Sequence, residues 1–256
     1  MTSGARGGDS RSWQSAGPEN MKSVFTRIGN SPTLSRVVPF VVFLALTGCQ
    51  DYFGEAGRYW FYLLKTAAAG WMLWGLRSAI PEMQWRPTWE AVLTGVVVFV
   101  VWVGIDGWYL PLDELLKKIA LVGGEPGRPF ARWNPHVQFG EGSVAAWFFI
   151  VIRITGASLV VPLLEEVFFR SFLYRFLVRA DFLSVPLGRF VLVPFVVTSV
   201  FFGLEHREWL AGILCGLAYQ GLVCWKRRLG DAIVAHAVTN FLLGLWVTSQ
   251  GAWQFW

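Results

Sequence analysis

Three short polar clusters lie in the most apolar half of the chain, and their residue types suit the hydrolysis of a peptide bond. The first is Glu165–Arg170, which reads Glu-Glu-Val-Phe-Phe-Arg. The second pairs Phe202 with His206, and the third pairs His236 with Asn240, each pair with three residues between its members. Ionisable groups in apolar membrane segments cost free energy to bury, so they mark a functional site by default.

Helical geometry predicts different roles for the two neighbouring glutamates. Glu166 and Arg170 are four positions apart and share one face of a helix, so they can form an ion pair. Glu165 points about 100° away from its neighbour and is expected to face a cavity. A purely structural role, tying two helices together, is the favoured interpretation for Glu166 and Arg170.

The remaining polar groups complete a water-activating arrangement. A carboxylate in an apolar cavity can act as a general base, and His206 could share a water molecule with Glu165. His236 and Asn240 project from one helix face, where their N–H groups could stabilise the oxyanion formed when water attacks a carbonyl. A buried histidine is usually structural, but two histidines with a carboxylate and an asparagine in lipid favour a site.

The composition predicts an integral membrane protein. Hydrophobic residues make up 54 % of the 256 residues and charged residues 15 %, whereas soluble domains carry about 25 % charged residues. A span needs roughly 20 apolar residues, so we expect an all-α polytopic transmembrane bundle of about seven to eight spans. The net charge of +5 is explained by membrane orientation and anionic lipid, so no nucleic-acid partner is inferred.

The chain divides into a polar tail and a membrane domain. Residues 1–35 are rich in Ser, Gly and Arg and are expected to form a disordered cytoplasmic tail. Residues 36–256 form the membrane domain, with the polar clusters in 143–256. The expected spans are Val37–Cys49, Tyr59–Ile80, Thr88–Leu110, Ser143–Val178, a pair within Phe190–Trp225, and Ala232–Val247.

The segment Ser143–Val178 is too long for one simple crossing. As a helix it would be about 54 Å long, against a hydrocarbon core of about 30 Å. Pro162 is a candidate kink, and Arg153 and Arg175 suit snorkelling anchors at opposite membrane faces, which places Glu165 near the midplane. An extra crossing near residues 155–158 is the eight-span alternative.

The segment Phe190–Trp225 is expected to be a helical hairpin. Residues 205–208, Glu-His-Arg-Glu, interrupt its apolar run and predict the turn. Gly212 and Gly216 form a pair of small residues that lets helices approach closely.

Lys and Arg concentrate on one set of predicted turns, which by the positive-inside bias places them, and the N-terminus, in the cytoplasm. The cavity is then expected to open to the extracytoplasmic half of the membrane. The long segment Pro111–Glu141 should be an outward loop with a short amphipathic piece, and His136 within it is interpreted as a loop histidine. Cys49, Cys215 and Cys224 are unclustered and are interpreted as small core residues.

The ordered trio Glu-Glu-x-x-x-Arg, Phe-x-x-x-His and His-x-x-x-Asn resembles the CAAX-protease and bacteriocin-processing family of membrane endopeptidases. The resemblance covers about residues 143–256. It implies an all-helical intramembrane endopeptidase of the bacterial inner membrane that cleaves a membrane-associated protein. By position, Glu165 resembles the catalytic base, His206 its partner on the water, and His236 with Asn240 the oxyanion-stabilising pair, while Glu166, Arg170 and Phe202 support them.

A narrower similarity, at residues 206–212 and 251–256, is to a bacterial subgroup that accompanies exosortase sorting systems. It implies an exosortase-system partner.

Several alternatives remain open from the sequence. Glu165, His206 and His236 could hold a catalytic Zn²⁺, but the His-Glu-x-x-His signature is absent, so metal-free chemistry is preferred and no cofactor is predicted. A non-catalytic bacteriocin-immunity or scaffold protein of the same fold is the second functional class. A transporter is the third, although the repeat symmetry expected of transporters is not evident.

Overall fold

The computed structural model describes residues 18–119 and 133–256, and within them every regular element is helical. This confirms the all-α prediction. The long elements are α2 (Pro32–Cys49), α3 (Gly54–Leu76), α4 (Trp89–Gly104), α10 (Leu192–Leu204), α11 (Trp209–Lys226), α12 (Gly230–Gln250) and a composite helix over residues 144–178.

Three helices of the described residues are long and apolar enough to cross a membrane, namely Pro32–Cys49, Val144–Val178 and Gly230–Gln250. Trp89–Gly104 and Leu192–Leu204 are shorter apolar helices. With α3 and α11, these elements make seven long helices, a number that is compatible with the expected seven to eight spans. Residues 155–158 lie inside the continuous helix 144–178, so the extra crossing of the eight-span alternative does not occur there.

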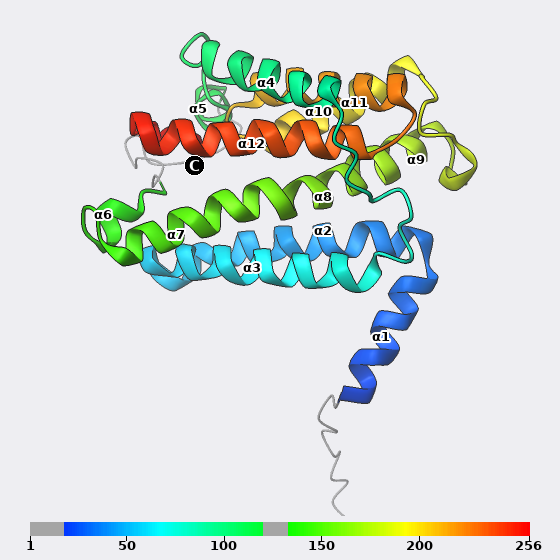
Figure 1. Ribbon diagram of the computed structural model, residues 1–256, viewed down its shortest axis with the longest axis horizontal. Helices are drawn as coiled ribbons and strands as arrows, with labels where there is room; N and C mark the ends of the chain where they lie inside the picture. Colours follow the sequence, from blue (N-terminus) through cyan, green and yellow to red (C-terminus); the bar gives the residue numbers. More distant parts are fainter. Residues whose placement is uncertain (1–17, 120–132) are drawn as a thin grey trace, which may run out of the picture.

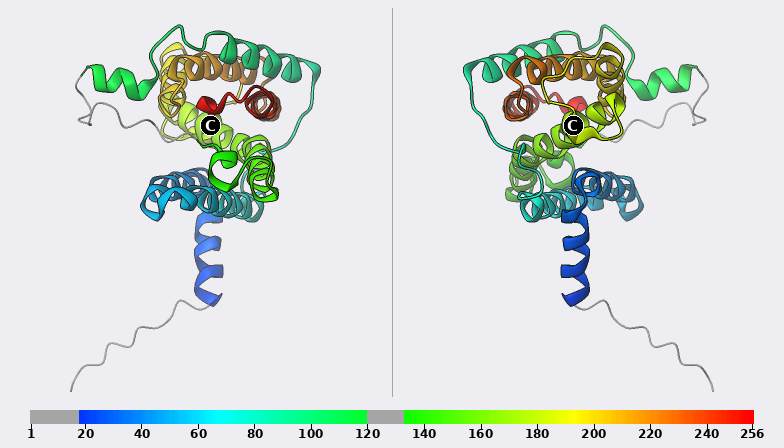
Figure 2. Two further views of the ribbon diagram at one scale, coloured as in Figure 1. Left: turned by 90° about the vertical axis from the view of Figure 1, so that its left-hand side faces the viewer. Right: turned by 90° about the vertical axis from the view of Figure 1, so that its right-hand side faces the viewer.

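The helices run lengthwise in stacked groups (Figure 1). Helices α2 and α3 form one layer, the composite helix crosses over it, and α4, α10, α11 and α12 lie beyond (Figures 1 and 2). We call the end where α2 begins the proximal end, which holds the turns at 77–88, 179–191 and 227–229. The opposite, distal end holds the turns at 105–111 and 205–208 and the segments 133–143 and 251–256.

The composite helix is not regular. It consists of α7 (Val144–Thr155), a π segment η2 (Gly156–Val160), α8 (Val161–Glu166), a second π segment η3 (Val167–Leu173) and α9 (Tyr174–Val178). The first π segment ends two residues before Pro162, so the expected disturbance of the helix at this proline takes the form of a wider turn. Gly156 in this segment permits close packing against α3, because a Cβ there would lie 2.7 Å from Cγ2 of Thr66.

The hairpin expected in Phe190–Trp225 is confirmed. Helix α10 ends at Leu204 and α11 begins at Trp209. A Cβ on Gly212 would lie 2.8 Å from Cα of Gly203, and one on Gly216 would lie 2.9 Å from Cα of Ser199. The two glycines therefore permit the close helix approach that their spacing predicts.

Part of the expected disordered tail is helical. Residues Pro18–Asn30 form α1, which projects from the bundle (Figure 1), and Ser31 caps the next helix by accepting a hydrogen bond from the amide of Leu34. The physical reason is apolar packing, since Phe25 contacts Trp71 edge to face at 4.5 Å and Ile28 is buried. Residues 1–17 lie outside the described part of the chain.

The expected loop Pro111–Glu141 contains two short helices in its described residues. They are α5 (Leu112–Lys118), the predicted amphipathic piece, and α6 (Pro135–Phe139). His136 lies on α6 rather than in a loop and packs against Trp147 and Trp253 at 5.6 and 5.7 Å. Of the three cysteines, Cys215 is buried as expected, whereas Cys49 is exposed and Cys224 is intermediate.

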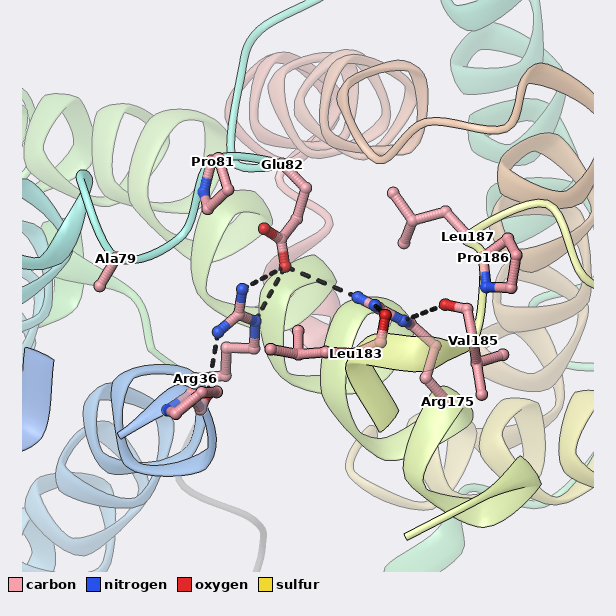
Figure 3. Close-up of a pocket in the computed structure, with 10 residues that line it drawn as sticks. Arg36, Ala79, Pro81, Glu82, Arg175, Leu183, Val185, Pro186 and Leu187 are labelled. Carbon is pink, nitrogen blue, oxygen red and sulfur yellow. Dashed lines mark hydrogen bonds and ion pairs between the residues drawn. The ribbon is translucent and has the colours of Figure 1, made fainter. Parts of the chain in front are cut away.

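A second charged cluster ties the proximal turns together (Figure 3). Glu82, in the turn between α3 and α4, pairs with Arg36 at 2.7 Å and with Arg175 at 3.8 Å, and Ser171 also donates a hydrogen bond to it. Arg175 further donates to the carbonyl of Val185 at 2.8 Å. The expectation that Arg175 snorkels to the membrane surface is therefore wrong, because internal partners satisfy its guanidinium.

Candidate active site

A cavity of about 240 Å³ lies at the distal half of the bundle and collects most of the predicted site residues. His206, His236, Asn240 and Phe202 line it, together with residues of α2, α3, α4 and α7. The second and third polar clusters therefore meet at this cavity. The first cluster does not line it but reaches it through His236, which lies beside Glu165 and Glu166.

Helix α12 presents His236 and Asn240 to this cavity because it is held tightly against α4. A Cβ on Gly95 of α4 would lie 2.5 Å from the carbonyl oxygen of Ala235, so only glycine fits. Thr239 donates a hydrogen bond to the Gly95 carbonyl at 2.9 Å. Packing and a buried hydrogen bond thus fix the face of α12 that carries the two polar side chains.

Glu166 occupies the centre of the site's polar network. Its side chain is fully buried, and Oε2 lies 3.2 Å from Nε of Arg170. Its other oxygen, Oε1, lies 3.0 Å from Nδ1 of His236. The predicted Glu166–Arg170 pair is confirmed, but Glu166 also orients a predicted catalytic histidine, a contact that the sequence interpretation lacks.

The hydrogen bond to Glu166 fixes the protonation of the His236 ring. A carboxylate only accepts hydrogen bonds, so Nδ1 of His236 must carry the proton. In the neutral ring Nε2 is then unprotonated, and it lies 3.9 Å from Oε2 of Glu165.

Glu165 is buried, and its Oε2 atom has no hydrogen-bond partner within the described residues. Ala157 and Val161, which precede it by eight and four positions on the composite helix, line the cavity. An unpaired carboxylate oxygen in an apolar bundle is costly. This oxygen therefore retains unused capacity to accept a hydrogen bond.

His206 follows α10 in the distal turn. Its Nδ1 lies 2.8 Å from the carbonyl oxygen of Phe202, and since a carbonyl only accepts, Nδ1 is the donor. Its ring packs against Trp102 at 5.4 Å and Phe202 at 5.0 Å. Nε2 of the neutral ring is left as an acceptor that can hold a water molecule.

Phe202 and Tyr219 form the aromatic walls of the site. The guanidinium carbon of Arg170 lies 4.1 Å from the Phe202 ring centre, and the Phe202 and His236 rings are 5.8 Å apart. Tyr219, which the sequence interpretation missed, lies 5.2 Å from the His236 ring and donates a hydrogen bond to Thr239. Its position on an apolar helix gave no signal distinct from core packing.

Asn240 is held from the opposite side of the cavity. Its Nδ2 group donates to the carbonyl of Ala157 at 2.8 Å, in the first π segment. One of its two N–H bonds is used in this contact, which leaves the second for a substrate. The wide turn before Pro162 thus fixes the orientation of the Asn240 side chain.

The cavity also contains charged groups that the sequence did not assign to the site. Lys65 and Arg153 line it, and so does Glu208 in the distal turn. Burial raises the pKa of Glu208 to about 7. Arg153, predicted to snorkel to the membrane surface, has its guanidinium against the ring of Trp133 at 4.5 Å.

The described residues contain no cluster of three or more His, Cys, Asp or Glu side chains arranged to hold a metal ion. Nδ1 of each site histidine is engaged by an oxygen acceptor. Histidines that bind a metal through Nε2 are usually held by the same kind of contact at Nδ1, so metal-free chemistry stays a prediction.

Residues 145–242 match the family model described as type II CAAX prenyl endopeptidase Rce1-like. The matched segment contains all three polar clusters and runs from α7 into α12. Searches of curated proteins and of solved structures gave no match.

Proposed function

We propose that this chain is an intramembrane endopeptidase that uses Glu165 as its general base, and the match of residues 145–242 to the Rce1-like family model of type II CAAX prenyl endopeptidases supports this proposal. The observation that carries the proposal is the free Oε2 atom of Glu165, buried beside Nε2 of His236 at 3.9 Å. The proposed substrate is a membrane-associated protein. The proposed location is the bacterial inner membrane.

The first half of the reaction forms a tetrahedral intermediate. A water molecule lies between the Glu165 carboxylate and Nε2 of His206, and its oxygen attacks the carbonyl carbon of the scissile peptide bond. Glu165 takes the proton of this water, and the carbonyl oxygen becomes an oxyanion.

Stabilisation of the oxyanion requires His236 in its imidazolium form. One N–H group of that ring donates to Glu166 and the other, on Nε2, donates to the oxyanion. Asn240 supplies the second donor through its remaining N–H bond. The negative charge of Glu166 stabilises the imidazolium, in the manner of a carboxylate behind a catalytic histidine.

The second half breaks the peptide bond. The oxyanion collapses, the C–N bond cleaves, and the proton on Glu165 moves to the leaving nitrogen. The second proton of the attacking water remains on the new carboxyl group and, when that group ionises, passes by way of Glu165 to the amine. The products are therefore a carboxylate and an ammonium group, and both protons of the water are accounted for.

Two non-enzymatic functions compete with this proposal. A bacteriocin-immunity or scaffold protein of the same fold would have no need of an unpaired buried carboxylate, whereas Glu165 has one. A transporter should bind its substrate between two symmetric halves of the chain. The charged network around Glu166 instead lies entirely within residues 145–242, the segment that matches the endopeptidase family model. Both observations favour the peptidase.

Cleavage of a peptide library tests the proposal. Purified full-length protein in phosphatidylcholine vesicles is incubated with chymotryptic peptides of a bacterial proteome, and new termini are identified by mass spectrometry. Glu165→Gln should abolish all new cleavage. The matched control is Glu141→Gln, whose side chain is 91 % exposed at the same end of the molecule, and this variant should cleave at the wild-type rate.

Retention of full activity by Glu165→Gln, or no cleavage by the wild-type protein, contradicts the proposed function. The neighbouring genes provide a separate observation on partners. An adjacent exosortase supports a sorting-system partner, and a bacteriocin cluster supports the immunity alternative.

A further inference from the structure

Two cationic side chains form part of the wall of the catalytic cavity. Lys65 comes from α3 and Arg153 from α7, and both line the cavity that His206, His236 and Asn240 share. The proposed hydrolysis of a peptide bond assigns no role to either cation.

Arg153 is surrounded by aromatic rings. Its guanidinium carbon lies 4.5 Å from the ring centre of Trp133, 5.0 Å from that of Tyr62 and 5.4 Å from that of Trp256. It forms no ion pair with a carboxylate in the described residues, although several acidic side chains at the distal end do form ion pairs with other cations. Cation–π contacts are worth roughly 0.5–2 kcal/mol, so they offset only part of the cost of a cation in this apolar bundle.

Lys65 adds a second positive charge to the same wall. It is 6 % exposed, donates a hydrogen bond to Thr47 at 2.9 Å, and lies 4.9 Å from the Phe43 ring centre. Two cations on one cavity wall create a positive potential that attracts an anionic ligand.

The helix that carries Arg153 also carries the proposed catalytic base, Glu165. Arg153, Ala157, Val161 and Glu165 follow one another at intervals of four residues, and the two intervening residues also line the cavity. Glu165 is twelve residues from Arg153, or about 18 Å along the helix axis. An extended peptide advances about 3.3 Å per residue, so roughly three to five residues cover this distance once side-chain reach is included.

We infer that Arg153, together with Lys65, is a specificity-determining residue that binds a carboxylate of the peptide substrate a few residues from the scissile bond. This inference rests on the proposed peptidase function. The carboxylate is either the α-carboxylate of the substrate's C-terminus or an Asp or Glu side chain. Arg is suited to it, because its planar guanidinium binds carboxylates through two parallel hydrogen bonds.

Esterification of the peptide library tests the inference. The chymotryptic library is divided, and every carboxylate in one half is converted to its methyl ester, which removes the charge. Wild-type protein in uncharged phosphatidylcholine vesicles should cleave the free library roughly 10- to 100-fold faster than the ester library, the factor expected for one charge-assisted hydrogen-bonded contact. Arg153→Gln should cleave both halves at the same low rate.

Two further variants separate charge from folding. Arg153→Lys keeps the charge and should retain a preference for free carboxylates. Arg77→Gln removes an arginine that also stacks on a tryptophan, Trp74, at 4.2 Å, but at the proximal end, and should behave as wild type. Two synthetic peptides based on a cleaved sequence then identify which carboxylate is bound. One has a C-terminal amide and an internal Glu, the other has a free C-terminus and an internal Gln, and the peptide that is cleaved faster carries the recognised carboxylate.

Equal cleavage of the two libraries by the wild-type protein overturns the inference and leaves the peptidase function intact. Retention of the full preference by Arg153→Gln overturns it as well. The inactive Glu165→Gln protein allows peptide binding to be measured without cleavage. When both libraries are passed over this immobilised protein, it should retain peptides with free carboxylates in preference to their methyl esters. Equal retention contradicts carboxylate binding, and absence of any Glu165-dependent cleavage contradicts the proposed function instead.

Discussion

Nδ1 of His236 lies 3.0 Å from Oε1 of Glu166, and the other oxygen of the same carboxylate faces Arg170 at 3.2 Å. Glu166 therefore connects Arg170 to the histidine that we propose stabilises the oxyanion. Glu166, Arg170 and His236 are all buried. Removing one of these side chains therefore leaves a buried charged or polar group without its partner, which is costly.

This relationship predicts two effects of Glu166→Gln. Loss of the buried carboxylate leaves Arg170 uncompensated and should lower the free energy of unfolding by about 3–5 kcal/mol. The same loss removes the anion that stabilises the His236 imidazolium, so cleavage should be slower and should decline at a lower pH than in the wild type. Thermal unfolding in detergent and a pH–rate profile measure the two effects.

Arg170→Gln is the matched comparison for this experiment. It breaks the same ion pair but leaves the Glu166–His236 contact in place, so it should destabilise the protein without moving the alkaline limb of the pH profile to lower pH. An unchanged profile in Glu166→Gln would show that the histidine does not depend on this carboxylate.

The sequence predicted the elements of the site better than their contacts. Apolar run lengths, the polar interruption at residues 205–208 and the Gly212–Gly216 spacing are local features, and they correctly predicted the helices and the hairpin. The spacing of Glu166 and Arg170 also predicted their ion pair, because both residues lie on one helix. The Glu166–His236 contact joins residues that are 70 positions apart in the sequence and lie on different helices. No local sequence pattern predicts such a contact.

Arg153 illustrates why the sequence does not predict the contacts of charged residues in spans. A lone arginine near the end of an apolar run usually snorkels to the surface, and the sequence gives no sign that Tyr62, Trp133 and Trp256 enclose this one. Those rings come from three separate segments. The two π segments also make the side-chain directions on the composite helix hard to predict. Each wider turn rotates the side chains that follow it relative to their positions on a regular α-helix.

Two glycines on α11 provide a test of the helix packing beside the site. A Cβ on Gly216 would lie 2.9 Å from Cα and 3.0 Å from the carbonyl oxygen of Ser199, so Gly216→Ala should separate α10 from α11 and cost about 1–3 kcal/mol. The nearest atom to a Cβ on Gly221 is Cζ of Phe195 at 4.0 Å. Gly221→Ala should therefore be neutral or stabilising by up to about 1 kcal/mol, and equal unfolding temperatures of the two variants would contradict the packing.

The proximal cluster predicts acid sensitivity. Burial would raise the pKa of Glu82, but the hydrogen bond from Ser171 and the ion pair with Arg36 outweigh it and hold this pKa below its usual value. A carboxyl with a lowered folded-state pKa contributes stability that is fully present above its unfolded pKa of about 4.3 and is lost as the pH falls further. Unfolding temperatures should therefore fall below about pH 4.3 in the wild type, whereas Glu82→Gln should be less stable at pH 7 and show a smaller decrease in acid.

Chelation tests the metal-free mechanism. Dialysis of the active protein against a strong zinc chelator should leave cleavage unchanged, and elemental analysis should find well below one metal ion per chain. Loss of zinc together with activity, and its recovery on zinc addition, would assign Glu165, His206 and His236 as ligands instead.

The side of the membrane to which the cavity opens follows from the distribution of charge between the two ends. Basic residues concentrate in the proximal turns, at Arg77, Arg86, Arg179, Arg189 and residues 226–228, so the positive-inside bias places that end in the cytoplasm. The cavity residues Glu208 and Trp256 lie at the distal end, so we expect the cavity to open on the extracytoplasmic side. Single cysteines at Glu141 and Ser184, both exposed and at opposite ends, are introduced into a cysteine-free background. A membrane-impermeant thiol reagent should label position 141 in intact cells and position 184 only after lysis, and the reverse pattern would turn the site toward the cytoplasm.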